Sequence, residues 1–195
     1  MTYLLGLTGS IGMGKSTTAR LFKEAGCDVW DADEAVHRLY AKGGAAVAPL
    51  HAMFSGVIER GAVSRDRLKA IIAERPEALN DIEAIVHPLV AKDRACFLDE
   101  TTSDIAVFDI PLLYETGADG WLHAVVCVTV APDIQRARVL QRGSMTEAQF
   151  ETILAKQMPD AEKRARADYV IVTDTLDHAR QQVQAVITDI QQGIG

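Results

Sequence analysis

The chain has 195 residues, 48% of them hydrophobic and 24% charged, which suits one folded domain with an insertion and argues against intrinsic disorder. It carries 20 basic and 27 acidic residues, a net charge of −7, which disfavours a general nucleic-acid binder. No apolar run is long enough to span a membrane, and the opening MTYLLGLTG lacks a basic leader. We therefore expect a cytoplasmic protein with no membrane, nucleic-acid or obligate protein partner.

The three cysteines, Cys27, Cys96 and Cys127, lie far apart in the chain. There is no Cys-x-x-Cys pair and no cluster of Cys with His, so neither a disulfide framework nor a zinc site is expected. The three are interpreted as small buried apolar residues in a reducing compartment.

The first elements alternate between strand and helix. Residues 3–8 form an apolar run beside glycine, typical of a buried strand, and a helix is expected from Lys15 to just before Gly26. Residues 27–30 predict a second strand. A helix follows to about Lys42, where Gly43 and Gly44 end it.

Residues 45–100 carry a helical pattern almost throughout. Ser64 is placed to cap one helix, Pro76 to begin a second and Pro88 to begin a third. A helical stretch of this length between strands predicts an insertion.

The remaining strands are expected at 105–110, 124–130 and 169–172, and their apolar runs suit a parallel sheet covered on both faces. A helix is predicted from Pro132 to about Arg142, and Thr146 with Gln149 forms a capping box for the next. The final helix carries its apolar stripe on Leu176, Ala179, Val183, Val186 and Ile190. The fold class is α/β, with a mostly parallel five-stranded sheet flanked by helices.

Residues 9–16, Gly-Ser-Ile-Gly-Met-Gly-Lys-Ser, match the phosphate-binding pattern G-x-x-x-x-G-K-[ST] between a predicted strand and a predicted helix. Glycines let the backbone N–H groups approach phosphates, and the helix N-terminus adds partial positive charge. Lys15 is expected to reach the β- and γ-phosphates of ATP, and Ser16 to hold Mg²⁺. Thr17 is the next hydroxyl able to touch a phosphate. The expected ATP-binding residues of the loop are Gly9, Ile11, Gly12, Met13, Gly14, Lys15, Ser16 and Thr17.

Acidic residues follow two predicted strands. Asp109 ends one of them and resembles the carboxylate that holds Mg²⁺, directly or through water. Asp31 and Asp33 follow another, at the carboxyl edge where ligands bind in such sheets. Residues two apart on an extended chain face the same way, so one or both carboxylates are expected to point at the γ-phosphate. A carboxylate there can act as a base, while Asp31 is equally suited to cap the next helix.

Arg138 and Arg142 are four residues apart and share one helix face. Residues 133–166 contain seven basic and five acidic residues, whereas the rest of the chain is strongly acidic. This basic segment predicts a lid that closes over ATP, with both arginines near the transferring phosphate. A lone histidine such as His87 is by spacing alone more often structural.

The assembled pattern resembles the dephospho-CoA kinase family over about residues 3–172. The resemblance is carried by the loop, by Asp31-Ala32-Asp33, by His87-Pro88, by residues 109–115 (Asp-Ile-Pro-Leu-Leu-Tyr-Glu), by 135–142 and by 167–171. It implies a P-loop NTPase three-layer fold. It also implies a core of about 1–44, 101–132 and 167–195, a helical CoA-side insertion of about 45–100 and a lid of about 133–166.

The resemblance also implies roles. Asp33 is expected to take the proton of the ribose 3′-hydroxyl of dephospho-CoA, with Lys15 and Arg142 holding the transferring phosphate and Thr8 beside the nucleophile. The residues expected near dephospho-CoA are Thr8, Asp33, His87, Leu112, Leu113 and Glu115. ATP and Mg²⁺ are the expected cosubstrate and metal.

The chain departs from the family's usual pattern at a few positions. Ser10 and Met13 stand in variable loop positions. Thr173-Asp174 replaces an Asp-Asn pair on the adenine side, and Gly143-Ser144 follows Arg142, where the lid hinge is expected to be looser. Two alternatives stay open: another small-molecule kinase, for a nucleoside monophosphate or sugar acid, and a nucleotide-binding regulator. The sequence holds no N-K-x-D motif, which disfavours a GTPase.

Overall fold

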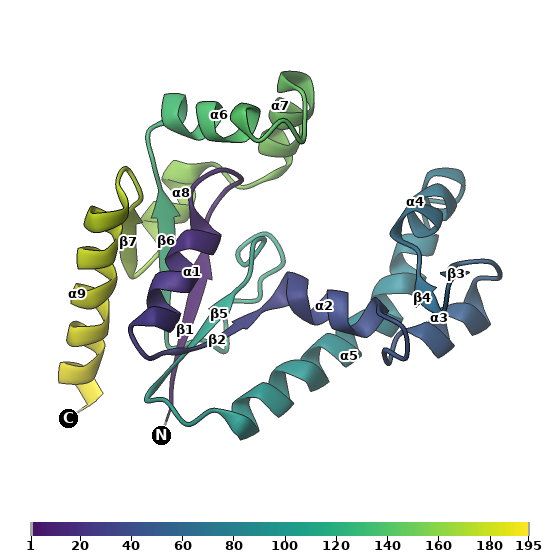
Figure 1. Cartoon of the computed structure of the whole chain (residues 1–195), viewed down its shortest axis with the longest axis horizontal. Helices are drawn as coiled ribbons and strands as arrows, with labels where there is room; N and C mark the ends of the chain where they lie inside the picture. The colour runs from purple at the N-terminus through teal and green to yellow at the C-terminus, as the bar shows by residue number, and fades with distance from the viewer. Residues whose placement is uncertain (1, 195) are drawn as a thin grey trace. The chain divides into compact units, whose positions relative to one another are not determined.

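The computed structural model describes residues 2–194 and divides the chain into two compact units (Figure 1). One unit holds Met1–Trp30 and Thr101–Gly195, and the other holds Asp31–Glu100.

The first unit is built on a five-stranded sheet. Its strands lie in the order β2 (Asp28–Asp31), β5 (Ile105–Asp109), β1 (Tyr3–Thr8), β6 (Ala124–Thr129) and β7 (Tyr169–Val172). β1 pairs in parallel with β5 and β6, and β6 pairs in parallel with β7. The predicted α/β fold with a mostly parallel five-stranded sheet is confirmed.

Both β5 and β6 are buried along their whole length, as expected of strands that are apolar on both faces. Helices α1 (Lys15–Glu24) and α9 (Leu176–Ile194) contact one another and share the apolar cluster of the sheet. Within the predicted stripe of α9, Ala179, Val183, Val186 and Ile190 are buried, but Leu176 is 44% exposed. The assignment of Leu176 to the buried stripe is therefore wrong, because it begins the helix beyond the edge of the core.

Three helices connect β6 to β7, namely α6 (Pro132–Gln141), α7 (Glu147–Lys156) and α8 (Asp160–Arg166). Figure 1 shows α6 and α7 beyond the carboxyl ends of β1 and β6. The predicted capping box of Thr146 and Gln149 is present. Helix α8 was not predicted, because only seven residues separate Pro159 from Ala167 and most of them are exposed.

The second unit contains α2 (Ala32–Tyr40), α3 (Val47–Met53), α4 (Arg65–Glu74), α5 (Ala78–Glu100) and a hairpin of β3 (Ile58–Glu59) and β4 (Ala62–Val63). It has its own apolar cluster, which includes Leu39, Leu50, Val57, Leu68 and Ile82. The prediction of helix almost throughout missed the hairpin. Its two-residue strands are too short to show an alternating pattern. Arg60 and Gly61, both at positive φ, form the turn.

One predicted helix start in this unit is wrong. Pro88 lies inside α5 and does not begin a new helix. A proline removes one backbone hydrogen bond, but Ile82 and Val86 are buried in the apolar cluster and hold the helix on that face. Ser64 is the N-cap of α4 but makes no side-chain cap hydrogen bond.

The cysteines divide into two groups. Cys27 and Cys127 are buried, and burial raises the pKa of Cys27 to about 11 and that of Cys127 to about 12. Cys96 is exposed on α5, so the expectation that all three are buried is wrong for this residue. Among the helices within residues 2–194, none is long and apolar enough to cross a membrane.

Candidate functional site

The loop between β1 and α1 has a backbone that only glycine adopts without strain at two points. Gly12 has φ 77° and Gly14, the N-cap of α1, has φ 89°. There is also no room for a side chain, because a Cβ on Gly14 would lie 2.8 Å from Thr173 Oγ1. A glycine loop of this kind that leads into a helix N-terminus suits the binding of an anion.

Side chains from distant elements hold this loop. The Ile11 N–H donates to Gln157 Oε1 at 3.1 Å, and Gln135 Nε2 donates to the Ile11 carbonyl at 2.7 Å. The Thr173 hydroxyl donates to the Met13 carbonyl at 2.6 Å. Gln157 and Thr173 were not predicted as loop supports, because neither has a local sequence signal that points to residues about 150 positions earlier.

Lys15, the first residue of α1, forms an ion pair with Asp109, the last residue of β5. The two meet because β1 and β5 are neighbouring strands, with Leu7 opposite Asp109. The Asp109 side chain is 1% exposed and that of Lys15 is 16% exposed. The Thr8 hydroxyl, also buried, donates to the Pro111 carbonyl at 3.2 Å. These predicted residues thus gather at the carboxyl edge of the sheet.

The oxygen donors beside the loop suit Mg²⁺. The exposed Ser16 hydroxyl stands at the start of α1, and Asp109 supplies a carboxylate at the end of β5. Mg²⁺ is usually held by one or two protein oxygens together with water and phosphate, so this donor set fits the metal. Within residues 2–194 no cluster of three or more His, Cys, Asp or Glu side chains could hold a metal by itself.

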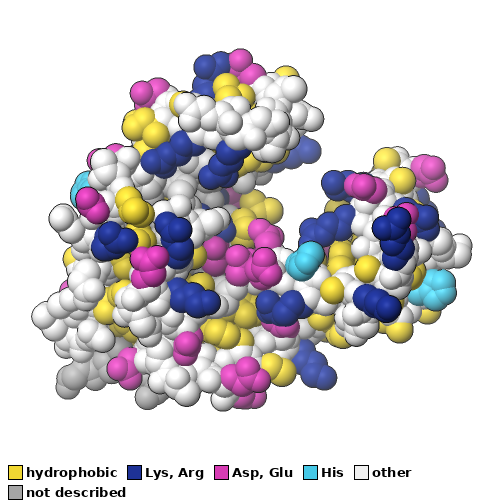
Figure 2. All heavy atoms as spheres, viewed as in Figure 1, with side chains coloured by type: hydrophobic (Ala, Val, Ile, Leu, Met, Phe, Trp, Pro, Cys, Tyr) yellow, Lys and Arg dark blue, Asp and Glu magenta, His cyan; other side chains and the backbone are white. Residues whose placement is uncertain are grey.

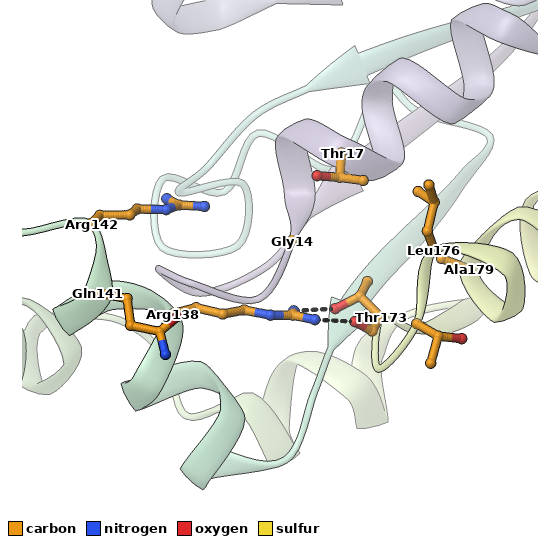
Figure 3. Close-up of a pocket in the computed structure, with 9 residues that line it drawn as sticks. Gly14, Thr17, Arg138, Gln141, Arg142, Thr173, Leu176 and Ala179 are labelled. Atoms are coloured by element: carbon orange, nitrogen blue, oxygen red, sulfur yellow. Dashed lines mark hydrogen bonds between the residues drawn. The ribbon is translucent and has the colours of Figure 1, made fainter.

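A cavity of about 430 Å³ opens beside the loop (Figure 3). Arg138 and Arg142 extend into it from α6, and the Arg138 guanidinium donates to the Thr173 hydroxyl at 3.0 Å and to the Thr173 carbonyl. The wall also contains Gly14 and Thr17. Four lining residues were not predicted, namely Gln141, Thr175, Leu176 and Ala179. The sequence gives no signal for this wall, because the exposure of the apolar Leu176 is seen only in the structure.

Basic side chains accompany the cavity. Figure 2 shows Lys and Arg side chains along the lower side of the α6–α7 segment, over the start of α1 in Figure 1. Arg142 is the C-cap of α6, so its side chain leaves the helix at the end that precedes Gly143. A cavity that joins a glycine-rich loop to arginines suits an anionic nucleotide.

The segment after β5 divides into packing and polar residues. Leu113 is fully buried with Tyr114 and Val125, whereas Leu112 is 42% exposed. Glu115 Oε1 lies 2.7 Å from Lys163 Nζ and accepts the Met158 N–H at 2.9 Å. Burial raises the pKa of Glu115, but the hydrogen bonds from Lys163 and Met158 outweigh this effect and hold it below its usual range. Glu115 thus connects this segment to the α7–α8 region.

The remaining predicted residues lie in the second unit. Asp31 caps α2, because its side chain accepts the N–H groups of Asp33 and Glu34 at 2.8 and 3.1 Å. Asp33 is exposed in the first turn of that helix. The argument that both carboxylates face the same way along an extended chain is therefore wrong, since the helix begins at Ala32. His87 is exposed on α5.

Comparison with known proteins identifies the family of the chain. The sequence model of the family described as dephospho-CoA kinase matches residues 3–178. The chain is 65% identical over 193 residues to a dephospho-CoA kinase of Ruegeria pomeroyi, covering 99% of this chain and 98% of the relative. It is 58% identical over 190 residues to one of Cereibacter sphaeroides, covering 97% and 96%. The solved dephospho-CoA kinase of Campylobacter jejuni has a TM-score of 0.71 at 25% identity, with both chains fully covered.

Proposed function

Because the chain belongs to the dephospho-CoA kinase family, we propose that it transfers the γ-phosphoryl group of ATP to the ribose 3′-hydroxyl of dephospho-CoA. The products are CoA and ADP, and the reaction is the final step of CoA biosynthesis. The observation that carries this proposal at the site is the meeting of Lys15 and Asp109 beside the glycine loop.

The proposed ATP site combines the loop with the 430 Å³ cavity. The triphosphate lies along the loop N–H groups, with Lys15 at the β- and γ-phosphates and Thr17 as a further hydroxyl donor. The nucleoside of ATP occupies the cavity, between the wall that contains Arg138 and the exposed Leu176. Arg142, at the end of α6, stabilises the charge that spreads over the transferring phosphoryl group.

Ser16 and Asp109 are the residues proposed to hold Mg²⁺, Asp109 directly or through water. When bound, the metal neutralises phosphate charge. In the structure, Lys15 neutralises Asp109. The binding of the triphosphate offers Lys15 a stronger partner and leaves the carboxylate for the metal side of the site.

In the proposed transfer, Asp33 accepts the proton of the 3′-hydroxyl as its oxygen bonds to the γ-phosphorus and the bond to the ADP oxygen breaks. Asp33 suits this role because Asp31 satisfies the N-terminus of α2 and the Asp33 side chain is exposed. Residues 133–166 act as the lid that excludes water, which would otherwise take the phosphoryl group.

The proposed neighbours of the acceptor, dephospho-CoA, are Thr8, His87, Leu112, Leu113 and Glu115. They contribute to the site in different ways. Leu112, 42% exposed, offers an apolar contact, while the buried Leu113 supports the segment from below. Glu115 orients the same segment through Lys163. The core, insertion and lid boundaries given above, and a cytoplasmic location without an obligate protein partner, belong to the same proposal.

The test is a coupled ADP-release assay with ATP, Mg²⁺ and dephospho-CoA on the wild type, Asp33→Asn and Glu34→Gln. Glu34 is the matched control, since it is an exposed carboxylate on the same turn of α2. We expect CoA formation by the wild type and Glu34→Gln, and a loss of about 10²-fold or more in Asp33→Asn.

Each of the other possible results would reject one part of the proposal. Turnover with little effect of Asp33→Asn would retain the substrate and reject the base. ADP release no faster than with ATP alone would reject dephospho-CoA as the acceptor. Nucleoside monophosphates and sugar acids would then be screened in its place.

A further inference from the structure

Both backbone polar groups of one phosphate-loop residue, Ile11, are held by glutamine side chains. Ile11 N–H donates to Gln157, in the link between α7 and α8, at 3.1 Å. The Ile11 carbonyl accepts from Gln135, in the first turns of α6, at 2.7 Å. Gln135 is 4% exposed, an unusual degree of burial for a glutamine. Its side chain is therefore committed to the contact that it makes.

The chemistry of the backbone assigns the two amides opposite roles. A backbone N–H can only donate, so the atom of Gln157 that faces it must be the carbonyl oxygen. A backbone carbonyl can only accept, so the atom of Gln135 that faces it must be the NH₂ nitrogen. Gln157 serves as an acceptor and Gln135 as a donor.

Hydrogen bonds, more than packing, restrain the loop at Ile11, because a cavity lies beside it. A cavity of about 890 Å³ lies beside this part of the loop, and both glutamines line it together with Met13 and Leu154. The chain turns at positive φ immediately afterwards, at Gly12, where a Cβ would lie 2.5 Å from Val139 Cγ2 on α6. The direction of the N–H groups that follow Ile11 therefore depends on how the two peptide groups that flank Ile11 are oriented.

Gln157 is itself anchored through the next residue. The Met158 N–H donates to Glu115 Oε1 at 2.9 Å, and the same oxygen pairs with the fully buried Lys163. Two successive residues of the α7–α8 link thus bind the phosphate loop on one side and the segment after β5 on the other.

We propose that Gln157 and Gln135 are positioning residues that set the phosphate loop for nucleotide, Gln157 by accepting from Ile11 and Gln135 by donating to it. The inference rests on the proposed function only in taking the loop as the ATP phosphate site. It ties loop geometry to the base of the lid segment, since both glutamines belong to residues 133–166.

The experiment uses the full chain with Gln→Glu substitutions at both positions and with Gln157→Ala. Gln181, an exposed glutamine on α9, is replaced by Glu and by Ala as the control. Glutamate keeps a carbonyl-type acceptor, so Gln157→Glu retains its bond to Ile11. It lacks a donor, so Gln135→Glu loses its bond. Both add one negative charge beside Ile11, at its N–H in Gln157→Glu and at its carbonyl in Gln135→Glu.

The first readout is amide hydrogen exchange at Ile11. It is measured without nucleotide, so it can be compared even for a variant that does not bind nucleotide. We expect Gln157→Ala to speed exchange about tenfold or more, and Gln157→Glu to stay within about threefold of the wild type. The second is calorimetric affinity for Mg²⁺–ADP. We expect Gln157→Ala to weaken it about five- to tenfold, and Gln135→Glu to weaken it about fivefold more than Gln157→Glu. The KM for dephospho-CoA should stay within about twofold in every variant that folds.

Unchanged exchange at Ile11 in Gln157→Ala would overturn the inference, as would equal losses of Mg²⁺–ADP affinity in the two glutamate variants. If the loop were not the ATP phosphate site, the result would look different, because the wild type itself would then not bind Mg²⁺–ADP; failure of dephospho-CoA as acceptor would leave that binding unchanged. Thermal unfolding of each variant identifies one that is simply unfolded. If Gln135→Glu is unfolded, Gln157→Glu against Gln157→Ala decides the matter by exchange and by affinity.

Discussion

Lys15 and Asp109 form an ion pair that joins the first residue of α1 to the last residue of β5. Each neutralises the other at an edge of the sheet where the backbone amides already favour negative charge. The pair therefore places a lysine and a carboxylate together beside the loop that we propose binds phosphate.

Asp109→Asn keeps the volume of the side chain and removes its charge. We expect a loss of about 1–3 kcal/mol in the free energy of unfolding, because Lys15 loses its charged partner. Activity should fall about 10²-fold and require more Mg²⁺, measured by ADP release across a Mg²⁺ titration. Asp104→Asn, at an exposed carboxylate just before β5, is the control. A normal rate and Mg²⁺ dependence in Asp109→Asn would exclude Asp109 from the metal side of the site.

Thr173→Val tests the hydroxyl between Met13 and Arg138. Valine has nearly the same shape but can neither donate to the Met13 carbonyl nor accept from Arg138. We expect destabilisation of about 1–3 kcal/mol, from buried polar groups left unpaired, and weaker binding of Mg²⁺–ADP. Chemical unfolding and calorimetry measure the two effects. Thr188→Val, on an exposed turn of α9, should leave both unchanged, and the same result in Thr173→Val would refute the assigned role.

Glu115→Gln tests the link to Lys163 through pH. The native pKa of Glu115 is lowered, so its ionised form stabilises the fold above the unfolded value of about 4.3 and this stabilisation is lost as pH falls through the native pKa. We expect Glu115→Gln to be about 1–3 kcal/mol less stable at pH 7, because Lys163 is left buried without a counter-charge. The gap to the wild type should narrow between about pH 5 and pH 3.

Unfolding midpoints measured across this range, with Glu162→Gln as the matched exposed carboxylate on α8, decide the point. A gap between Glu115→Gln and the wild type that is the same at pH 7 and pH 3 would show that Glu115 does not act through its charge.

The thiols should react with a disulfide reagent in two classes. Exposed Cys96 is expected to react at once at pH 8, while Cys27 and Cys127 stay protected, since burial raises their pKa values to about 11 and about 12. Unfolding should release both. Cys96→Ser should abolish the fast phase, and two fast thiols in the native wild type would contradict the burial of the other pair.

Local patterns predicted most of the framework. The strand at Tyr3–Thr8, the helix from Lys15 and the capping box at Thr146 follow from the order of neighbouring residues alone. The hairpin at Ile58–Val63 and the helix at Asp160–Arg166 were missed, because both are too short for a periodic signal. The prediction that Pro88 begins a helix was wrong, since a buried face can keep a helix continuous despite one lost hydrogen bond.

By itself, the sequence determined the glycine loop, the helix that follows it and the apolar strands around them. These depend on backbone preferences and spacing within a few residues. Only the tertiary structure decided which distant groups meet there. Lys15 pairs with Asp109, which is 94 positions away in the sequence, and Ile11 bonds to Gln157, which is 146 positions away. Strand order and helix packing decide which residues form such pairs. No local sequence pattern encodes them, because a polar side chain meets its distant partner only when the chain has folded.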